Sequence, residues 1–124
     1  MNVFEIEADL ERNVLRTYFR GVISGDDMRV HVEQCEALIS KMRPEFTVVV
    51  DLAELETMEL DCVPYLTNLM DRYLAAGVGK VVRVIPDPNK DIGFNLLSLT
   101  HYRGRVPILT CETRAEADRA LGLP

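Results

Sequence analysis

The sequence lacks the segments that would carry a chain into or across a membrane. No apolar run approaches the roughly 18 residues that a membrane-spanning helix needs. Residues 1–9 mix acidic with apolar side chains, and they have neither the basic start nor the apolar core of a secretory signal. We therefore expect a cytoplasmic protein without a membrane partner.

Cysteine and positive charge are both scarce. Cys35, Cys62 and Cys111 are the only cysteines and show no Cys-x-x-Cys spacing, which fits a reducing compartment better than a disulfide framework. We expect all three as small buried hydrophobic side chains. The 14 Lys and Arg residues against 20 Asp and Glu residues give a formal net charge of -6, so the surface repels nucleic acid and we expect no nucleic-acid partner.

The groups that usually carry catalysis are also sparse. His31 and His101 are the only histidines, and neither belongs to a cluster with metal-ligand spacing. Gly77 and Gly79 flank a helix-to-strand turn, and no glycine-rich loop leads from a strand into a helix, which excludes the dinucleotide and P-loop patterns. The sequence therefore predicts no metal, no cofactor and no enzymatic activity.

What is present fits one α/β domain over residues 1–124, because 124 residues with 48% hydrophobic content can bury one core. Alternating polarity predicts a leading β-hairpin of Phe4–Ala8 and Val14–Gly21. Ser24 is a candidate cap for a helix that ends by about Arg43, before a proline. That helix has one apolar stripe: Met28, Val32, Cys35, Ile39 and Met42.

The middle of the chain predicts a buried strand and a second helix. Phe46–Leu52 is an almost continuous apolar run, typical of a central parallel strand, and Ala53–Leu60 is the expected loop behind it. The helix begins at Asp61 and ends at Gly77. Its predicted inner residues are Val63, Leu66, Met70, Tyr73 and Leu74.

The last third continues the strand-helix pattern. Val81–Ile85 predicts a strand, and a weaker helix follows with Ile92, Leu96 and Leu99. Val106–Leu109 is the last strand, which its proline places at an edge or a strand start. Thr113 and Glu116 form a capping box for a final helix. The order ββαβαβαβα predicts a single-domain mixed sheet layered with helices, antiparallel in its leading hairpin and parallel afterwards.

Asp61 is the most informative residue of the chain. Loops that leave the carboxyl ends of parallel strands gather at one edge of a sheet, where function usually resides. Asp61 brings a negative charge to the start of the second helix, and we expect it to cap that helix, which is worth about 1 kcal/mol. We interpret the neighbouring Glu54, Glu56 and Glu59 as solvated charge and not as part of a catalytic pair.

The central part of the chain resembles the STAS domain of anti-sigma-factor antagonists and sulfate-transporter tails. The resemblance rests on Val48–Leu52, the loop to Leu60, and the helix through Leu66, Leu69 and Gly77. It extends over nearly the whole chain, because the element order agrees from the opening hairpin to the closing helix. It implies a STAS-like fold and a regulatory protein that binds other proteins in signalling.

In the STAS family, a partner kinase phosphorylates a serine or threonine in an Asp-Ser-Ser-Gly-type stretch. The resemblance places that stretch on Glu59, Leu60, Asp61 and Cys62. Glu59 keeps the acidic position, but Asp61 stands at the acceptor position and cannot take phosphate from a serine kinase. Either its carboxylate imitates phosphate, with about one charge in place of nearly two, or the switch is lost and the chain binds through a helix face or a pocket.

Two functions follow from the resemblance. The first is a non-catalytic interaction module whose partner is an anti-sigma-type kinase or another signalling protein. Its candidate docking surface lies around Asp61 and consists of Glu54, Glu56, Met58, Pro64, Tyr65 and Asn68. The alternative is a carrier or sensor of a small hydrophobic or anionic ligand, bound by Met58, Leu60, Phe94 and Leu97. Gly21–Asp27 is similar to the strand-to-helix transition of lipid-carrier-like STAS relatives, which motivates this alternative.

A response-regulator receiver is excluded, although Asp51 stands near a predicted strand end. Receivers have an acidic pair after the first strand and a lysine after the last, whereas this chain opens with a hairpin and has Thr110 and Cys111 at the end of its last strand. The sequence leaves the oligomeric state open, and a homodimer is one option.

Overall fold

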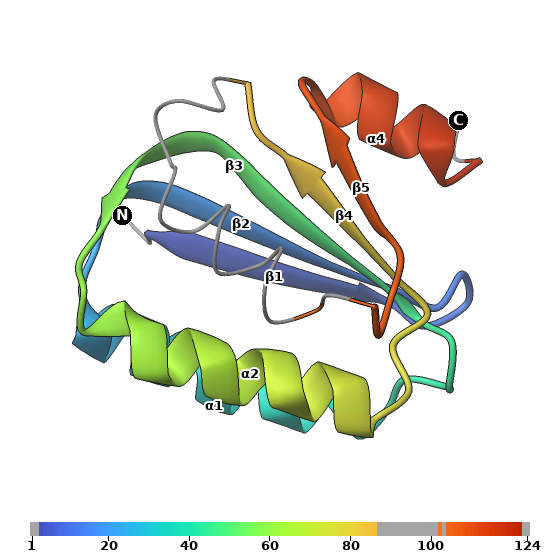
Figure 1. The fold of residues 1–124 in the computed structure, drawn as a ribbon, viewed down its shortest axis with the longest axis horizontal. Coiled ribbons are helices and arrows are strands. Elements are labelled where there is room, and N and C mark those ends of the chain that lie inside the picture. Colours follow the sequence, from blue (N-terminus) through green and yellow to red (C-terminus); the bar gives the residue numbers. More distant parts are fainter. Residues whose placement is uncertain (1–2, 87–101, 103, 123–124) are drawn as a thin grey trace.

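A five-stranded mixed sheet is the centre of the computed structural model, which describes residues 3–86, 102 and 104–122 (Figure 1). Its strands lie side by side in chain order: β1 (Phe4–Asp9), β2 (Val14–Ile23), β3 (Thr47–Met58), β4 (Lys80–Val84) and β5 (Ile108–Cys111). β1 runs antiparallel to β2, and every other neighbouring pair is parallel. The predicted leading hairpin and the parallel strands behind it are confirmed.

Helices cover both faces of the sheet. α1 (Gly25–Ile39) and α2 (Cys62–Ala75) lie together on one face, and α4 (Arg114–Ala120) packs on the other face over β4 and β5. The predicted helix with Ile92, Leu96 and Leu99 falls outside the described residues. The α/β class, the mixed sheet and the layering with helices are as the sequence predicts.

The alternation of side chains along the strands creates two cores. The larger core lies between the sheet and α1 and α2, and it includes Leu15, Phe19, Val48, Leu66 and Tyr73. The smaller core lies under α4, where β2, β3, β4 and β5 contribute Val14, Val49, Val82, Val84 and Cys111. Burial on both faces explains the continuous apolar run that identified β3. The three cysteines are all free and buried, as predicted.

β3 is longer than the sequence predicts. The predicted loop over Ala53–Leu60 is wrong, because β3 continues to Met58. β2 has 10 residues and stays paired with this extension of β3 through two register shifts. Leu55 is consequently buried towards the helices, at 3% exposure. Glu54 and Glu56 therefore lie on a strand and not in a loop.

The inner face of α2 is rotated relative to the predicted one. Val63 is predicted to point inward, but its side chain is 40% exposed. The buried stripe starts one residue earlier, because Cys62 is the first residue of the helix and points into the core. The stripe consists of Cys62, Leu66, Leu69, Met70 and Tyr73.

The last strand and the last helix also differ from the prediction in detail. β5 starts at Ile108, directly after Pro107, and it is an edge strand as the proline indicates. The Thr113 hydroxyl caps α4 by accepting from the Glu116 N–H at 3.1 Å. The predicted capping box is only half formed, because the Glu116 carboxylate accepts from the Glu112 N–H instead, at 3.3 Å.

Candidate functional site

Two strand-to-helix junctions meet at the carboxyl edge of the sheet. β2 leads into α1 through Ser24, and β3 leads into α2 through residues 59–61. Ile23 and Met58 are register partners, and the Glu59 N–H donates to the Ile23 carbonyl at 2.9 Å. The N-termini of α1 and α2 therefore lie beside each other (Figure 1).

The N-terminus of α1 is closed by its own side chains. The Ser24 hydroxyl accepts from the Asp27 N–H at 3.1 Å, and the Asp27 carboxylate accepts from the Ser24 N–H at 3.0 Å. This reciprocal pair is a complete capping box, so the predicted cap at Ser24 is confirmed. Both side chains are thus engaged within the helix start.

The N-terminus of α2 is built differently. Asp61 occupies the N-cap position of α2, but its side chain makes no capping hydrogen bond. The predicted position is therefore right, and the predicted side-chain cap is wrong. The side chain packs against α1 instead: a Cβ placed on Gly25 would lie 2.7 Å from the Asp61 Cβ and 3.2 Å from its Oδ2. The carboxylate is thus held beside two helix N-termini, where a negative charge is favoured.

Gly25 is part of this site and was missed at the sequence level. The sequence marks Gly21–Asp27 only as a strand-to-helix transition, and Gly25 stands there as the first residue of α1. The contact with Asp61 joins two residues that are distant in sequence, so it follows only from the parallel pairing of β2 and β3. An unexplained glycine directly after a helix cap is the one signal that pointed to it.

Around Asp61 the chain exposes apolar side chains. Leu60 is 86% exposed, and Val63 at 40% stands in the first turn of α2. Val22 is 47% exposed and lies near the end of β2. β2 pairs with β3, and both strands end at the edge of the sheet that leads to Asp61. Acidic Glu59 and Asp61 are exposed among them. The result is a small apolar surface with negative charge.

Cys62 is next to this surface but does not belong to it. Its side chain is fully buried, and its thiol donates to the Ile23 carbonyl at 3.4 Å. Burial raises the pKa of the Cys62 thiol to about 11, so the thiol stays protonated at neutral pH. A reactive thiolate is therefore not available at this position.

The structure brings only part of the predicted docking residues together. Met58 ends β3 and is half-buried, and Tyr65 is half-buried on α2. Pro64 and Asn68 are exposed on the same helix. These residues are near Asp61 along the chain and share its junction.

The remaining two predicted residues lie elsewhere on β3. Glu54 forms an ion pair with Arg20 of β2, at 3.2 Å, and Glu56 is exposed on the extended part of the strand. Because a strand rises about 3.3 Å per residue, Glu54 and Glu56 lie roughly 13 Å and 7 Å before Met58 along β3.

A polar cluster lies buried beneath the helices. His31, which the sequence places beside the apolar stripe, is only 1% exposed and packs between Phe4 and Phe19. The His31 Nε2 lies 3.5 Å from the Cys35 Sγ. The Tyr73 hydroxyl donates a hydrogen bond to the same sulfur, at 3.6 Å. Burial lowers the pKa of His31 to about 4 and raises the pKa of Cys35 to about 12. All three groups are therefore neutral at physiological pH.

The enclosed space at this cluster is small. A cavity of about 20 Å³ lies between the sheet and the helices, which is room for about one water molecule. Of the residues predicted to bind a small ligand, Met58 and Leu60 do not line it, and Phe94 and Leu97 fall outside the described residues.

Within residues 3–86, 102 and 104–122, no group of three or more His, Cys, Asp or Glu side chains is arranged to hold a metal ion. Among the described helices, none combines the length and the apolar character needed to cross a membrane.

Comparison of the sequence with protein-family models and with curated proteins gives no match. Similarity is found only when the structure is compared with solved structures.

The chain is similar in structure to the anti-sigma factor antagonist SpoIIAA. The unphosphorylated form aligns with a TM-score of 0.66 at 18% identity, over 97% of this chain and 99% of SpoIIAA. The phosphorylated form of SpoIIAA from Bacillus aligns with a TM-score of 0.65 at 14% identity, over 94% and 98% of the two chains.

Two other solved structures support the same assignment of fold. A Shewanella loihica protein of the DUF3478 family, with a SpoIIAA-like fold, aligns with a TM-score of 0.72 at 12% identity, over 98% of this chain and 95% of that one. A candidate anti-sigma factor antagonist from Thermotoga maritima aligns with a TM-score of 0.63 at 15% identity, over 96% and 94%. The chain therefore has the SpoIIAA-like fold of STAS domains.

Proposed function

We propose that this chain is a cytoplasmic protein-interaction module without catalytic activity, and that it binds a signalling protein through the surface around Asp61. We call this the Asp61 surface and define it by Leu60, Asp61, Val63, Pro64, Tyr65 and Asn68, with Glu59 and Met58 at its margin. The observation that carries the proposal is the 86% exposure of Leu60 at the tip of the β3–α2 junction. The likeness to an anti-sigma factor antagonist supports it.

Leu60 has the properties of an anchor residue. Burying one leucine side chain in an interface removes apolar surface from water and contributes about 1.5–3 kcal/mol. Val63 extends the apolar centre, while Glu59 and Asp61 supply a charged margin. An apolar centre with a polar rim is the usual build of a protein–protein interface.

Asp61 gives this surface a permanent negative charge. In the STAS alignment proposed from the sequence, Asp61 stands at the phosphorylated position, where a phosphoserine would carry nearly two charges. The Asp61 carboxylate carries one, beside Gly25 at the N-terminus of α1. We propose that binding is consequently not switched by serine phosphorylation.

The proposed docking site is tested by capture from extracts of the cells in which the protein occurs. Leu60→Asp places a charge at the centre of the Asp61 surface. Leu10→Asp is the matched control, because Leu10 is also an exposed leucine, at 44%, and lies beyond the end of β1 in the hairpin turn. We expect one signalling protein to be retained by the wild type and by Leu10→Asp and to be lost with Leu60→Asp. Equal retention by all three, or no retained protein, would refute the proposal.

The absence of a phosphorylation switch is tested by Asp61→Ser. This variant restores a hydroxyl at the position that the STAS resemblance identifies as the acceptor. When the captured partner is a kinase of the anti-sigma type, we expect it to add one phosphate to Asp61→Ser and none to the wild type with ATP, as seen by mass spectrometry. Phosphorylation of the wild-type chain would contradict this part of the proposal.

The alternative function, a carrier of a small ligand, has little support from the cavity beneath the helices, which holds about 20 Å³. Native mass spectrometry of protein purified without denaturation distinguishes the two. We expect the mass of the chain alone, and a co-purified small molecule would favour the carrier.

A further inference from the structure

The outer edge of β1 offers backbone groups with which no described strand pairs. The Arg20 N–H donates to the Val3 carbonyl at 2.7 Å, and Val3 and Arg20 continue the antiparallel register of β1 with β2. Residues of an antiparallel strand alternate between pairs that exchange hydrogen bonds and pairs that do not. The N–H and C=O groups of Phe4, Ile6 and Ala8 therefore point away from β2. In the part of the chain that the structure describes, no strand pairs with this edge.

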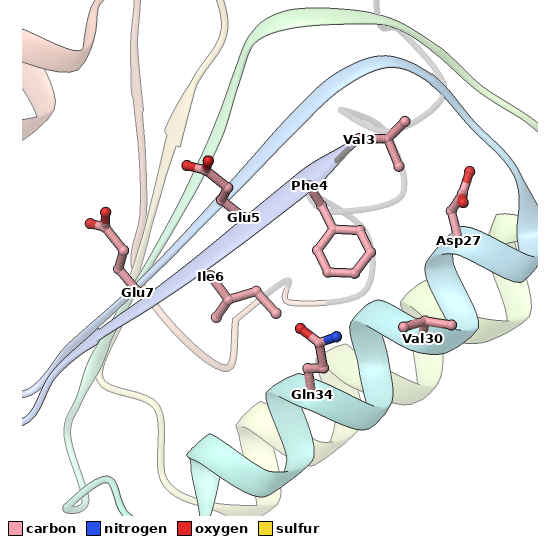
Figure 2. Close-up of a pocket in the computed structure, with 8 residues that line it drawn as sticks. All are labelled: Val3, Phe4, Glu5, Ile6, Glu7, Asp27, Val30 and Gln34. Carbon is pink, nitrogen blue, oxygen red and sulfur yellow. The ribbon is translucent and has the colours of Figure 1, made fainter. Parts of the chain in front are cut away.

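This edge borders an open groove of about 650 Å³ between β1 and α1 (Figure 2). Phe4 and Ile6 point from β1 towards α1, where Val30 and Gln34 face them across the groove. On the opposite side of the strand, Glu5 and Glu7 are exposed. The edge thus combines free hydrogen-bonding groups, an apolar side and an acidic side.

We propose that β1 binds an extended segment of a partner protein as an added strand, and that this segment alternates apolar with basic residues. Facing residues of two paired strands point to the same side of a sheet. Partner residues opposite Phe4 and Ile6 would enter the groove beside Val30, and their neighbours would stand beside Glu5 and Glu7. Main-chain bonds supply affinity in such strand addition, and alternate side chains supply specificity.

β2, which pairs with the other edge of β1, already has such an alternating pattern. β2 turns Leu15, Thr17 and Phe19 to the helices and Arg16, Tyr18 and Arg20 to the opposite face. Arg20 forms an ion pair with Glu5 at 3.1 Å, and the Tyr18 hydroxyl lies 3.5 Å from the Glu7 carboxylate. The side-chain pattern of β1 is therefore suited to a basic and apolar neighbour.

Charge argues against a second copy of this chain as the occupant. Two β1 edges paired in antiparallel fashion about Ile6 would place Glu5 of each copy opposite Glu7 of the other. Like charges directly opposite each other on neighbouring strands are destabilising, and charged side chains on edge strands commonly prevent such pairing. The net charge of -6 adds to this repulsion. A basic segment from another protein is the occupant that this edge favours.

The probe for the test is the capped peptide Lys-Val-Lys-Val-Lys-Val-Lys, and its control is the same peptide with Glu in place of Lys. Amide hydrogen exchange of the full chain is followed by NMR. We expect the basic peptide to slow exchange at Phe4, Ile6 and Ala8, while Glu5 and Glu7, which already bond to β2, stay unchanged. We expect it to bind about tenfold more tightly than the acidic peptide, since several cross-strand charge pairs change sign. Methylating the backbone nitrogens of alternate peptide residues, in the register that faces β1, should abolish the protection.

Charge reversal on the protein completes the test. In Glu5→Lys/Glu7→Lys the preference should invert, so that the acidic peptide binds more tightly. Glu45→Lys/Glu112→Lys carries the same change in net charge at exposed residues away from β1 and should keep the wild-type preference. The proposal is overturned if neither peptide slows exchange, if both variants change preference equally, or if protection exists without peptide and disappears on dilution, which would indicate a second copy. None of these outcomes depends on the Asp61 surface.

Discussion

Asp61 occupies the space that a side chain on Gly25 would need. Glycine to alanine inside a helix normally stabilises a protein by about 1 kcal/mol. Here the added Cβ would lie 2.7 Å from the Asp61 Cβ, so we expect Gly25→Ala to lower the free energy of unfolding by about 1–3 kcal/mol. In the Asp61→Gly background the same change should cost nothing. Urea unfolding of the four proteins measures this coupling, and an equal cost in both backgrounds would show that the contact does not exist.

The buried His31 makes the free energy of unfolding depend on pH. Burial lowers its folded-state pKa from 6.5 to about 4, so below pH 6.5 the unfolded chain binds a proton that the folded chain excludes. The free energy of unfolding should therefore be independent of this group above pH 6.5 and fall as the pH decreases towards 4. From pH 7 to pH 5 the loss is about 2 kcal/mol.

The matched variant for this pH effect is His31→Leu, which fills the same apolar site between Phe4 and Phe19 without a titrating group. We expect its free energy of unfolding to lose about 2 kcal/mol less than that of the wild type between pH 7 and pH 5. Denaturant titrations at the two pH values measure the difference. An identical loss in both proteins would assign the pH dependence to other groups.

At the level of elements, α1 and α2 begin side by side, but only α1 is capped by a side chain. Ser24 closes α1 through two hydrogen bonds, whereas Asp61 makes none to α2. Ser24→Ala should thus cost about 1 kcal/mol, and Asp61→Ala should cost well under half of that. Thermal and urea unfolding give both values. A larger cost for Asp61→Ala would restore Asp61 to the role of an ordinary cap.

The elements show which parts of the fold are encoded locally. The hairpin, the Ser24 cap and the apolar run of β3 follow from periodicity and capping, and they are predicted correctly. The extension of β3 to Met58 is not, because Glu54 and Glu56 suggest a loop and only the pairing with β2 keeps this segment extended. The exposure of Val63 likewise depends on where α2 meets the sheet.

At the scale of the whole molecule, the candidate site is a product of topology. The apolar pattern of the sequence resembles that of STAS domains and predicts a site at Asp61, and the fold is SpoIIAA-like. The contact of Asp61 with Gly25 and the free edge of β1 are properties of strands that are paired in space. Apart from the glycine after the Ser24 cap, no local pattern indicates them, so they become visible only in the folded chain.

The affinity of the captured partner for three purified proteins tests the central claim most directly. Isothermal titration calorimetry would compare the wild type with Leu60→Asp and Leu10→Asp, which introduce the same charge at two exposed leucines. If the Asp61 surface is the docking site, Leu60→Asp should bind about thirtyfold more weakly, the roughly 2 kcal/mol of an interface hot spot, and Leu10→Asp should match the wild type. Equal affinities for Leu60→Asp and the wild type would contradict the proposed function.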